Sequence, residues 1–118
     1  MSETDLLRSI IKELTSAGYW VFRVNSGTRG SGTVKLAPPG TPDICCVSPP
    51  GWIEVKLPGE SLSEKQAEWH ARAKGRGVRV GSVSGVSEAM VLVGTWVRQD
   101  STREGAALEL KRIAEDML

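Results

Sequence analysis

The feature that most constrains the fold is a pair of strand-like segments on either side of the turn signal Ser48-Pro49-Pro50-Gly51. The first segment follows Asp43 and is the apolar run from Ile44 to Val47. The second, from Trp52 to Leu57, alternates apolar and polar residues, which is the period of a half-buried strand. Two such segments joined by a four-residue turn predict a β-hairpin.

The charged residues of this hairpin predict a metal site. With residues 48–51 as the loop, Asp43 is expected opposite Lys56, and Cys45 opposite Glu54. Because side chains alternate between the two faces of a strand, Asp43, Glu54 and Lys56 share one face.

Asp43 and Glu54 are then diagonal neighbours, about 7–8 Å apart at their Cα atoms. Two carboxylates this close repel each other unless one is protonated or a cation lies between them. The pattern therefore favours Mg²⁺ or Mn²⁺, bound by oxygen ligands. The alternative is a salt-bridged solvent face.

Three motifs surround or lie within the hairpin: Gly40-Thr41-Pro42-Asp43, Ile53-Glu54-Val55-Lys56 and Leu62-Ser63-Glu64-Lys65-Gln66. Together they resemble the virus-type replication-repair nuclease (VRR-NUC) domain of the PD-(D/E)XK nuclease superfamily, from about Glu3 to Val93. The resemblance implies an α/β fold with a restriction-endonuclease-like core, a mixed β-sheet flanked by helices. It also implies a divalent-metal-dependent DNA endonuclease that hydrolyses phosphodiester bonds in branched DNA, such as a Holliday junction. Stand-alone members resemble junction-resolving homodimers and are common in phages.

The resemblance assigns the metal ligands. It implies that Asp43, Glu54 and the carbonyl of Val55 bind Mg²⁺ or Mn²⁺. It also brings Glu3 to the site, directly or through water, because the first helix of the family carries a glutamate with apolar residues three and seven positions later, as Leu6 and Ile10 are here. From the residues alone, a glutamate in the first turn of a helix is more often explained by compensation of the helix dipole.

Two further residues are candidates for catalysis. Lys56 can orient the attacking water and neutralise charge that develops on a phosphate. The resemblance implies that Gln66 supports Lys56 or that water. The alternative for Gln66 is a capping box with Ser63, which would explain this glutamine fully. His70 lies one position away from the predicted inward stripe of the same helix, where a lone histidine is usually a surface or packing residue.

Candidate DNA contacts precede the hairpin. Asn25 and Ser26 end a predicted strand, and the resemblance implies that they lie near the substrate backbone; turn chemistry explains them equally well. Arg23 lies on the same strand. Arg29 and Lys35 lie in a loop rich in Gly, Thr and Ser, and they add positive charge that could reach a phosphate.

Composition limits the remaining classes of function. A chain of 118 residues predicts one domain, with a core of about residues 3–93 and a C-terminal helical extension of about residues 101–118. The net charge of +1 argues against a protein that coats nucleic acid by bulk charge. The two cysteines are adjacent, so we expect no disulfide and a reducing, cytoplasmic compartment, which is the cytoplasm of the bacterial host if the chain is phage-encoded. No membrane association is expected.

Capping and periodicity predict the other elements. The expected order is a helix within residues 2–18, a strand at 19–25, a short strand at 34–36, a helix from Ser61 or Ser63 to about Lys74, a strand at 78–83, a short helix from Ser84 or Ser87 to Val93, a connection at 96–100 and a helix at 101–118. The last helix could pack on the domain or pair with a second copy. Other functions remain open: a nicking or restriction-like nuclease, a DNA-binding module without catalysis in a replication or packaging complex, or an interaction protein.

Overall fold

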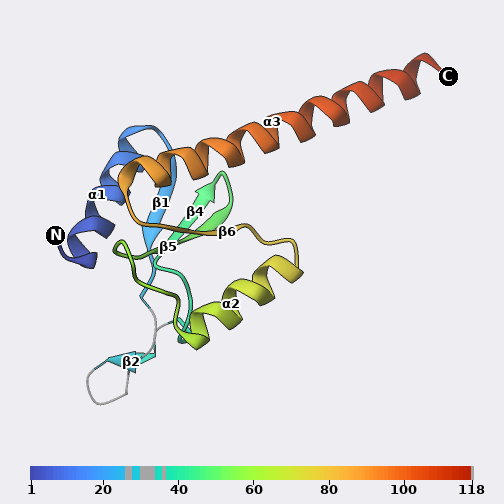
Figure 1. Cartoon of the computed structure of the whole chain (residues 1–118). Helices are drawn as coiled ribbons and strands as arrows, with labels where there is room; N and C mark the ends of the chain where they lie inside the picture. Colours follow the sequence, from blue (N-terminus) through green and yellow to red (C-terminus); the bar gives the residue numbers. More distant parts are fainter. Residues whose placement is uncertain (26–27, 30–33, 36, 118) are drawn as a thin grey trace.

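The computed structural model describes residues 1–25, 28–29, 34–35 and 37–117. These residues form three helices and two small sheets, which are arranged as in Figure 1. The elements in chain order are α1 (Glu3–Ser16), β1 (Trp20–Arg23), β2 (Thr28–Arg29), β3 (Val34–Lys35), β4 (Ile44–Ser48), β5 (Gly51–Val55), α2 (Glu64–Gly75), β6 (Val80–Val83) and α3 (Val86–Asp116). The α/β class expected from the sequence is confirmed.

A mixed four-stranded sheet forms the centre, in the order β1-β4-β5-β6. Strands β1, β4 and β5 are antiparallel neighbours, and β6 pairs parallel to β5. The parallel pair is connected through α2, since parallel neighbours need a crossover rather than a tight turn. Helices α1 and α3 lie on one side of the sheet and α2 on the other (Figure 1).

The core lies between the sheet and the pair α1 and α3. Alternate residues of the hairpin strands point into it, so that Ile44, Ile53 and Val55 are fully buried against residues of both helices. Helix α1 contributes Leu6, Leu7, Ile10 and Leu14, the apolar stripe predicted from its sequence. It begins at the predicted capping box, in which Ser2 and Asp5 cap each other's backbone.

The β4–β5 register differs from our prediction. The last pair of the ladder is Cys46 with Gly51, so the four residues between the paired strands are 47–50 rather than 48–51, and Cys45 pairs with Trp52 instead of Glu54. The predicted pairing of Asp43 with Lys56 is wrong for the same reason, because the observed register brings Asp43 opposite Glu54 when it is continued by one residue beyond Ile44 and Ile53. A shift of two residues keeps every side chain on its predicted face. The two carboxylates are therefore direct rather than diagonal neighbours.

The C-terminal third is one helix rather than two. We predicted a connection at residues 96–100, but α3 runs without interruption for 31 residues. Trp96 is buried in the core and Asp100 is tied to Arg79, so packing holds this segment in the helix. The expected capping box at residues 101–104 lies inside the helix, where the Thr102 hydroxyl donates to the carbonyl of Arg98 at 2.9 Å.

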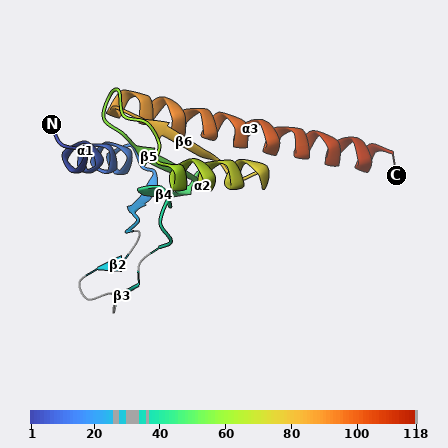
Figure 2. The ribbon, with the colours of Figure 1, turned by 60° about the horizontal axis from the view of Figure 1, so that its bottom comes forward.

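The second half of α3 projects away from the domain (Figures 1 and 2), which gives the molecule extents of 64 × 28 × 26 Å. Residues 101–117 are all exposed, including Leu108, Leu110 and Ile113. Strands β2 and β3 form a separate two-stranded ladder, so the short strand predicted at 34–36 is present at Val34–Lys35. Among the described helices, none combines the length and apolarity required to cross a bilayer.

Candidate active site

Asp43 and Glu54 lie next to each other where β4 begins and β5 ends. The backbone N–H of Val55 donates to Asp43 Oδ2 at 2.8 Å, which fixes the Asp43 carboxylate across the two strands. The Glu54 side chain is 1 % exposed, on the face of the sheet that α2 covers. A carboxyl group that is buried this completely is rare in a folded protein unless it is paired, protonated or bound to a metal.

Glu54 is held in its neutral form by its surroundings. Burial is the largest cause, followed by a hydrogen bond with Asp43 and by the negative charge of Asp43, and together they raise the pKa of Glu54 to about 9. The positive charge of Lys56 acts in the opposite direction. The predicted repulsion between the two carboxylates is therefore present, and a proton relieves it in the metal-free protein.

Glu3 approaches the same site from the N-terminus of α1. Burial, the charges of Glu60 and Asp43, and a hydrogen bond with Glu60 raise the pKa of Glu3, whereas Lys56 lowers it. Glu60 was not identified from the sequence. It lies in the loop after β5, where its Oε1 accepts from the backbone N–H of Leu57 at 3.2 Å. The charge of Lys56 therefore acts on both Glu3 and Glu54, which come from separate segments of the chain.

Gln66 forms the capping box that we gave as the alternative. Its Oε1 accepts from the N–H of Ser63 at 2.8 Å, and its own N–H donates to Ser63 Oγ at 3.2 Å. The cap uses the amide oxygen, so the amide nitrogen is the part of Gln66 that is left for a role towards Lys56 or water. The start of α2 is also fixed against Gly40, which has φ +92° and where a Cβ atom would lie 2.5 Å from the carbonyl oxygen of Lys65.

His70 is the functional candidate that the sequence reasoning underrated. Its side chain is 7 % exposed, and its Nε2 lies 4.0 Å from Glu54 Oε1. Within the described part of the chain, neither of these two buried atoms has a hydrogen-bond partner. Next to this pair, Trp52 and Trp69 pack edge to face with 5.2 Å between ring centroids. His70 lies on the same side of α2 as Gln66, one turn further on, and His70 and Ala73 are the buried residues of this helix. The spacing of four residues between Gln66 and His70 is the signal in the sequence that was missed.

The predicted DNA contacts lie along the strand next to Asp43. Arg23 pairs with Ile44, and the N–H of Val24 donates to the carbonyl of Asp43 at 2.7 Å. The carbonyl of Asn25 accepts from the N–H of Ala37 at 2.8 Å. The backbone of this strand therefore runs beside Asp43, but Arg23, which pairs with Ile44, lies on the opposite face of the sheet from Asp43 and Glu54. Ser26 lies outside the described residues. Arg29 and Lys35 belong to β2 and β3, which pair with each other.

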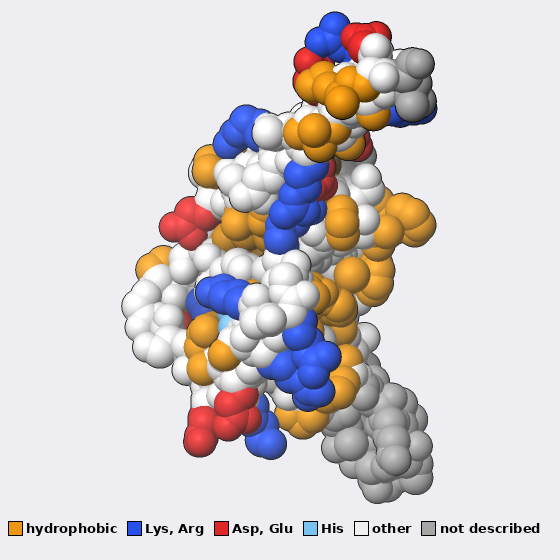
Figure 3. Space-filling view, turned by 90° about the vertical axis from the view of Figure 1, so that its right-hand side faces the viewer, with side chains coloured by type: hydrophobic (Ala, Val, Ile, Leu, Met, Phe, Trp, Pro, Cys, Tyr) orange, Lys and Arg blue, Asp and Glu red, His pale blue; other side chains and the backbone are white. Residues whose placement is uncertain are grey.

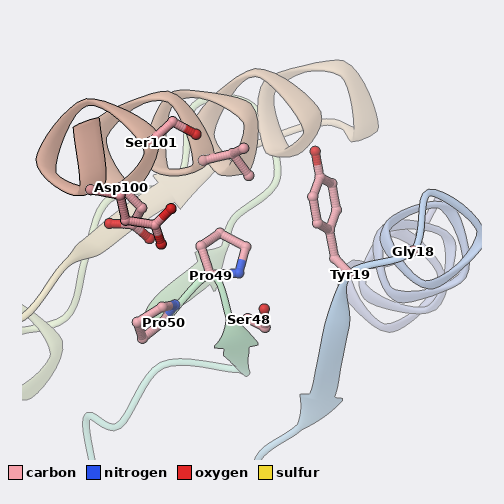
Figure 4. A pocket seen from close by; sticks show the side chains of 9 residues that line it. Gly18, Tyr19, Ser48, Pro49, Pro50, Asp100 and Ser101 are labelled. Atoms are coloured by element: carbon pink, nitrogen blue, oxygen red, sulfur yellow. The ribbon is translucent and has the colours of Figure 1, made fainter. Parts of the chain in front are cut away.

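The surface around the site is basic on one side. On the face shown in Figure 3, Lys and Arg side chains gather below the projecting end of α3. Arg72 and Lys74 lie in the last turn of α2, and Arg72 and Arg76 border a depression of about 310 Å³ that Trp52 and Trp69 also line. A second depression, of about 410 Å³, lies between Tyr19, the Pro49-Pro50 turn and α3 (Figure 4), at the opposite end of the hairpin from Asp43 and Glu54.

The carboxylates do not form a ready-made metal cage. Among the residues that the structure describes, no three His, Cys, Asp or Glu side chains are grouped so that they could hold a metal ion. Comparisons with known proteins found no match: no family model matches the chain, no curated protein is similar to it, and no solved structure matches it.

Proposed function

We propose that this chain is a divalent-metal-dependent DNA endonuclease of the VRR-NUC type, with a restriction-endonuclease-like core. The observation that carries the proposal is the direct juxtaposition of Asp43 with the buried Glu54 on neighbouring strands. The element order of the core supports it: a helix, three antiparallel strands, and a helix that crosses over to a parallel fourth strand. Lys56 follows directly after β5, within the charge field of both Glu3 and Glu54.

The donor set fits a hard divalent ion. Glu54 is a buried carboxyl next to Asp43, and the neighbouring acids raise the pKa of Glu3 and of Glu54. Mg²⁺ keeps several waters and needs only one or two protein carboxylates, so Asp43 and Glu54 are sufficient without a third acidic ligand. The carbonyl of Val55 and, through water, Glu3 would complete the site. Bound Mg²⁺ or Mn²⁺ supplies Lewis acidity towards the phosphate and the attacking water.

The residues of the chain then divide the remaining tasks. The Val55 N–H fixes Asp43, so the carboxylate needs no reorganisation on binding. Lys56 orients the attacking water and stabilises charge on the phosphate, and the Gln66 amide nitrogen supports Lys56 or the water. Arg23, Asn25, Ser26, Arg29 and Lys35 hold the substrate backbone. Branched or junction DNA is the proposed substrate.

We also propose that the nuclease is a homodimer. A symmetric junction requires two cuts, and two copies of the chain supply two sites. The second half of α3 supports the dimer because Ala106, Leu110, Ile113 and Met117 recur at intervals of four, three and four residues, and the last three are 68 %, 45 % and 82 % exposed. This is the spacing of a helix seam that pairs with another helix.

Cleavage of labelled DNA tests the proposal. Four-way junction, fork and linear duplex DNA are incubated with Mg²⁺ or Mn²⁺ and with wild type, Lys56→Ala, or the control Lys12→Ala, an exposed lysine of α1. We expect junction cleavage that requires metal and falls by about 10²–10³-fold in Lys56→Ala, with no change in Lys12→Ala. Cleavage of duplex or nicked DNA alone would support a restriction-like or nicking nuclease and remove the junction assignment.

A DNA-binding module without catalysis is the second candidate. It is favoured by the finding that no three metal-binding side chains are grouped within the described residues. Binding of Mn²⁺ in the absence of DNA separates the two functions. A nuclease site binds Mn²⁺ and loses it in Asp43→Ala, whereas a protein that binds DNA but neither Mn²⁺ nor cleaves any substrate fits the second candidate.

A further inference from the structure

The interface between β5 and α2 contains a pair of polar atoms that face each other across a gap. Glu54 Oε1 and His70 Nε2 are 4.0 Å apart, in side chains that are 1 % and 7 % exposed. Among the described residues, both atoms lack a hydrogen-bond partner. More than nine in ten buried polar groups in folded proteins do have one, so each of these atoms requires an explanation. Metal binding by the other oxygen of Glu54 would leave both of these atoms unexplained.

The width of the gap restricts what can fill it. A direct N–H···O bond requires about 2.7–3.2 Å, so the pair is not bonded at 4.0 Å. A bridging water with two bonds of about 2.8 Å at a tetrahedral angle would hold its partners about 4.6 Å apart, which is wider than this gap. A rotation of either side chain that closes about 1 Å satisfies both atoms at once. A direct hydrogen bond is therefore the smallest rearrangement.

The surroundings of His70 determine which atom donates. A histidine ring always carries an N–H, on Nδ1, on Nε2 or on both, and Nε2 is the nitrogen that faces Glu54. The Trp69 ring also lies near it, with 6.3 Å between ring centroids. Glu54 Oε1 is an acceptor whether Glu54 is ionised or carries its proton on the oxygen that bonds to Asp43, so the two atoms pair when the ring proton is on Nε2.

We propose that His70 is the positioning residue of Glu54: its Nε2–H donates to Glu54 Oε1 and holds the carboxylate so that its other oxygen is directed to Asp43 and the metal. Carboxylates that bind metals are commonly oriented in this way by a hydrogen-bonded neighbour. The purpose of the positioning rests on the proposed nuclease function, but the hydrogen bond itself does not. Direct ligation of a metal by Nε2 is the competing arrangement, and it requires the opposite tautomer.

The tautomer can be measured directly because His70 is the only histidine in the chain. Full-length protein labelled with ¹⁵N-histidine gives one imidazole in long-range ¹H–¹⁵N spectra, first without metal and then with Mg²⁺. We expect the Nε2–H tautomer in both states, with an Nε2 resonance that shifts in Glu54→Gln. A bare Nε2 in either state would overturn the proposal, and so would an Nε2–H resonance that Glu54→Gln leaves unchanged.

Two substitutions test the consequence for the metal. His70→Leu removes the donor and His70→Gln keeps an N–H donor, and thermal unfolding identifies a variant that fails to fold. Removal of such a supporting bond weakens metal affinity by about 10–100-fold, so calorimetric Mg²⁺ titration should show this loss in His70→Leu and recovery in His70→Gln. Equal affinity in wild type and both variants would overturn the positioning role. If wild type binds no Mg²⁺ and cleaves no DNA, the nuclease function fails, whereas the tautomer and its response to Glu54→Gln still decide the hydrogen bond.

Discussion

Two pairs of ionisable side chains connect helices to the sheet, and they differ in how fully their polar atoms are bonded. Arg79, just before β6, donates to both carboxylate oxygens of Asp100 at 2.8 and 2.9 Å and to the carbonyl of Pro50 at 2.9 Å. Its guanidinium also lies 5.4 Å from the centre of the Trp96 ring. Glu54 and His70 connect β5 to α2, yet 4.0 Å separates their facing atoms.

The difference follows from what each pair does. The Arg79 and Asp100 side chains are 16 % and 32 % exposed, and every contact of the pair serves to hold α3 against the hairpin turn. The Glu54–His70 pair is more deeply buried. Among the described residues, Glu54 Oε1 and His70 Nε2 form no hydrogen bond. Leaving buried polar atoms unbonded costs about 1–3 kcal/mol for each group. The proposed hydrogen bond from His70 Nε2–H to Glu54 Oε1 removes this cost, and in the proposed nuclease it leaves the other oxygen of Glu54 for the metal.

The largest effect is expected from Glu54→Gln. The substitution keeps the shape of the side chain but removes its charge as a metal ligand, so metal-dependent cleavage should fall by about 10³-fold or more. Folding without metal should not suffer, because a neutral amide replaces a carboxyl that burial already keeps neutral. Cleavage assays and thermal unfolding in EDTA measure the two effects. Undiminished cleavage by Glu54→Gln would exclude Glu54 from the site.

The two pairs should also respond to pH with opposite sign. The pKa of Glu54 is raised from 4.5 to about 9 on folding, so its contribution to stability is full below pH 4.5 and is lost as the pH rises towards 9. The hydrogen bonds from Arg79 lower the pKa of Asp100 below its ordinary value of 3.8, so its contribution is full above that pH and is lost as the pH falls.

Denaturant unfolding of the metal-free protein across this range separates these contributions. The difference in unfolding free energy between wild type and Glu54→Gln should decrease from pH 4.5 to 9, and the difference between wild type and Asp100→Asn should change only in acid. A flat difference for Glu54→Gln between pH 4.5 and 9 would mean that the carboxyl is ionised throughout.

These two pairs also show how far the sequence could predict the structure. The face shared by Asp43, Glu54 and Lys56 was predictable because strand alternation is local and survives a register shift of two residues. The start of α2 was predictable because its cap lies within four consecutive residues. His70 was underrated because the direction in which a short helix faces is set by packing against another element, here through Trp52 and Trp69. The continuity of α3 depends on Arg79, which lies 21 residues before Asp100, and no local pattern contains that contact.

A smaller effect is expected from Arg79→Met. The substitution removes the hydrogen bonds to Asp100 and Pro50 but leaves an apolar side chain over Trp96, and the thermal midpoint should fall by about 5 °C. Because this pair lies at the end of the hairpin that is far from Asp43, the cleavage rate of the folded protein should stay the same. A melting curve and a cleavage assay below the transition check both parts. A large loss of cleavage with no loss of stability would show that Arg79 belongs to the site.

The smallest effect on the stability of the domain is expected beyond Asp100, where α3 has left the sheet. Leu108 and Leu110 are each 68 % exposed, but Leu110 lies on the seam with Ile113 and Met117, and Leu108 lies on the opposite side of the helix. Replacement of either leucine by Gln should change stability by less than about 0.5 kcal/mol. Their effects on molar mass measured by light scattering should differ: Leu110→Gln should convert a dimer to a monomer, and Leu108→Gln should not. If wild type is monomeric at every concentration, the exposed seam has no second copy as its partner, and the two cuts of a junction would have to come from separate binding events.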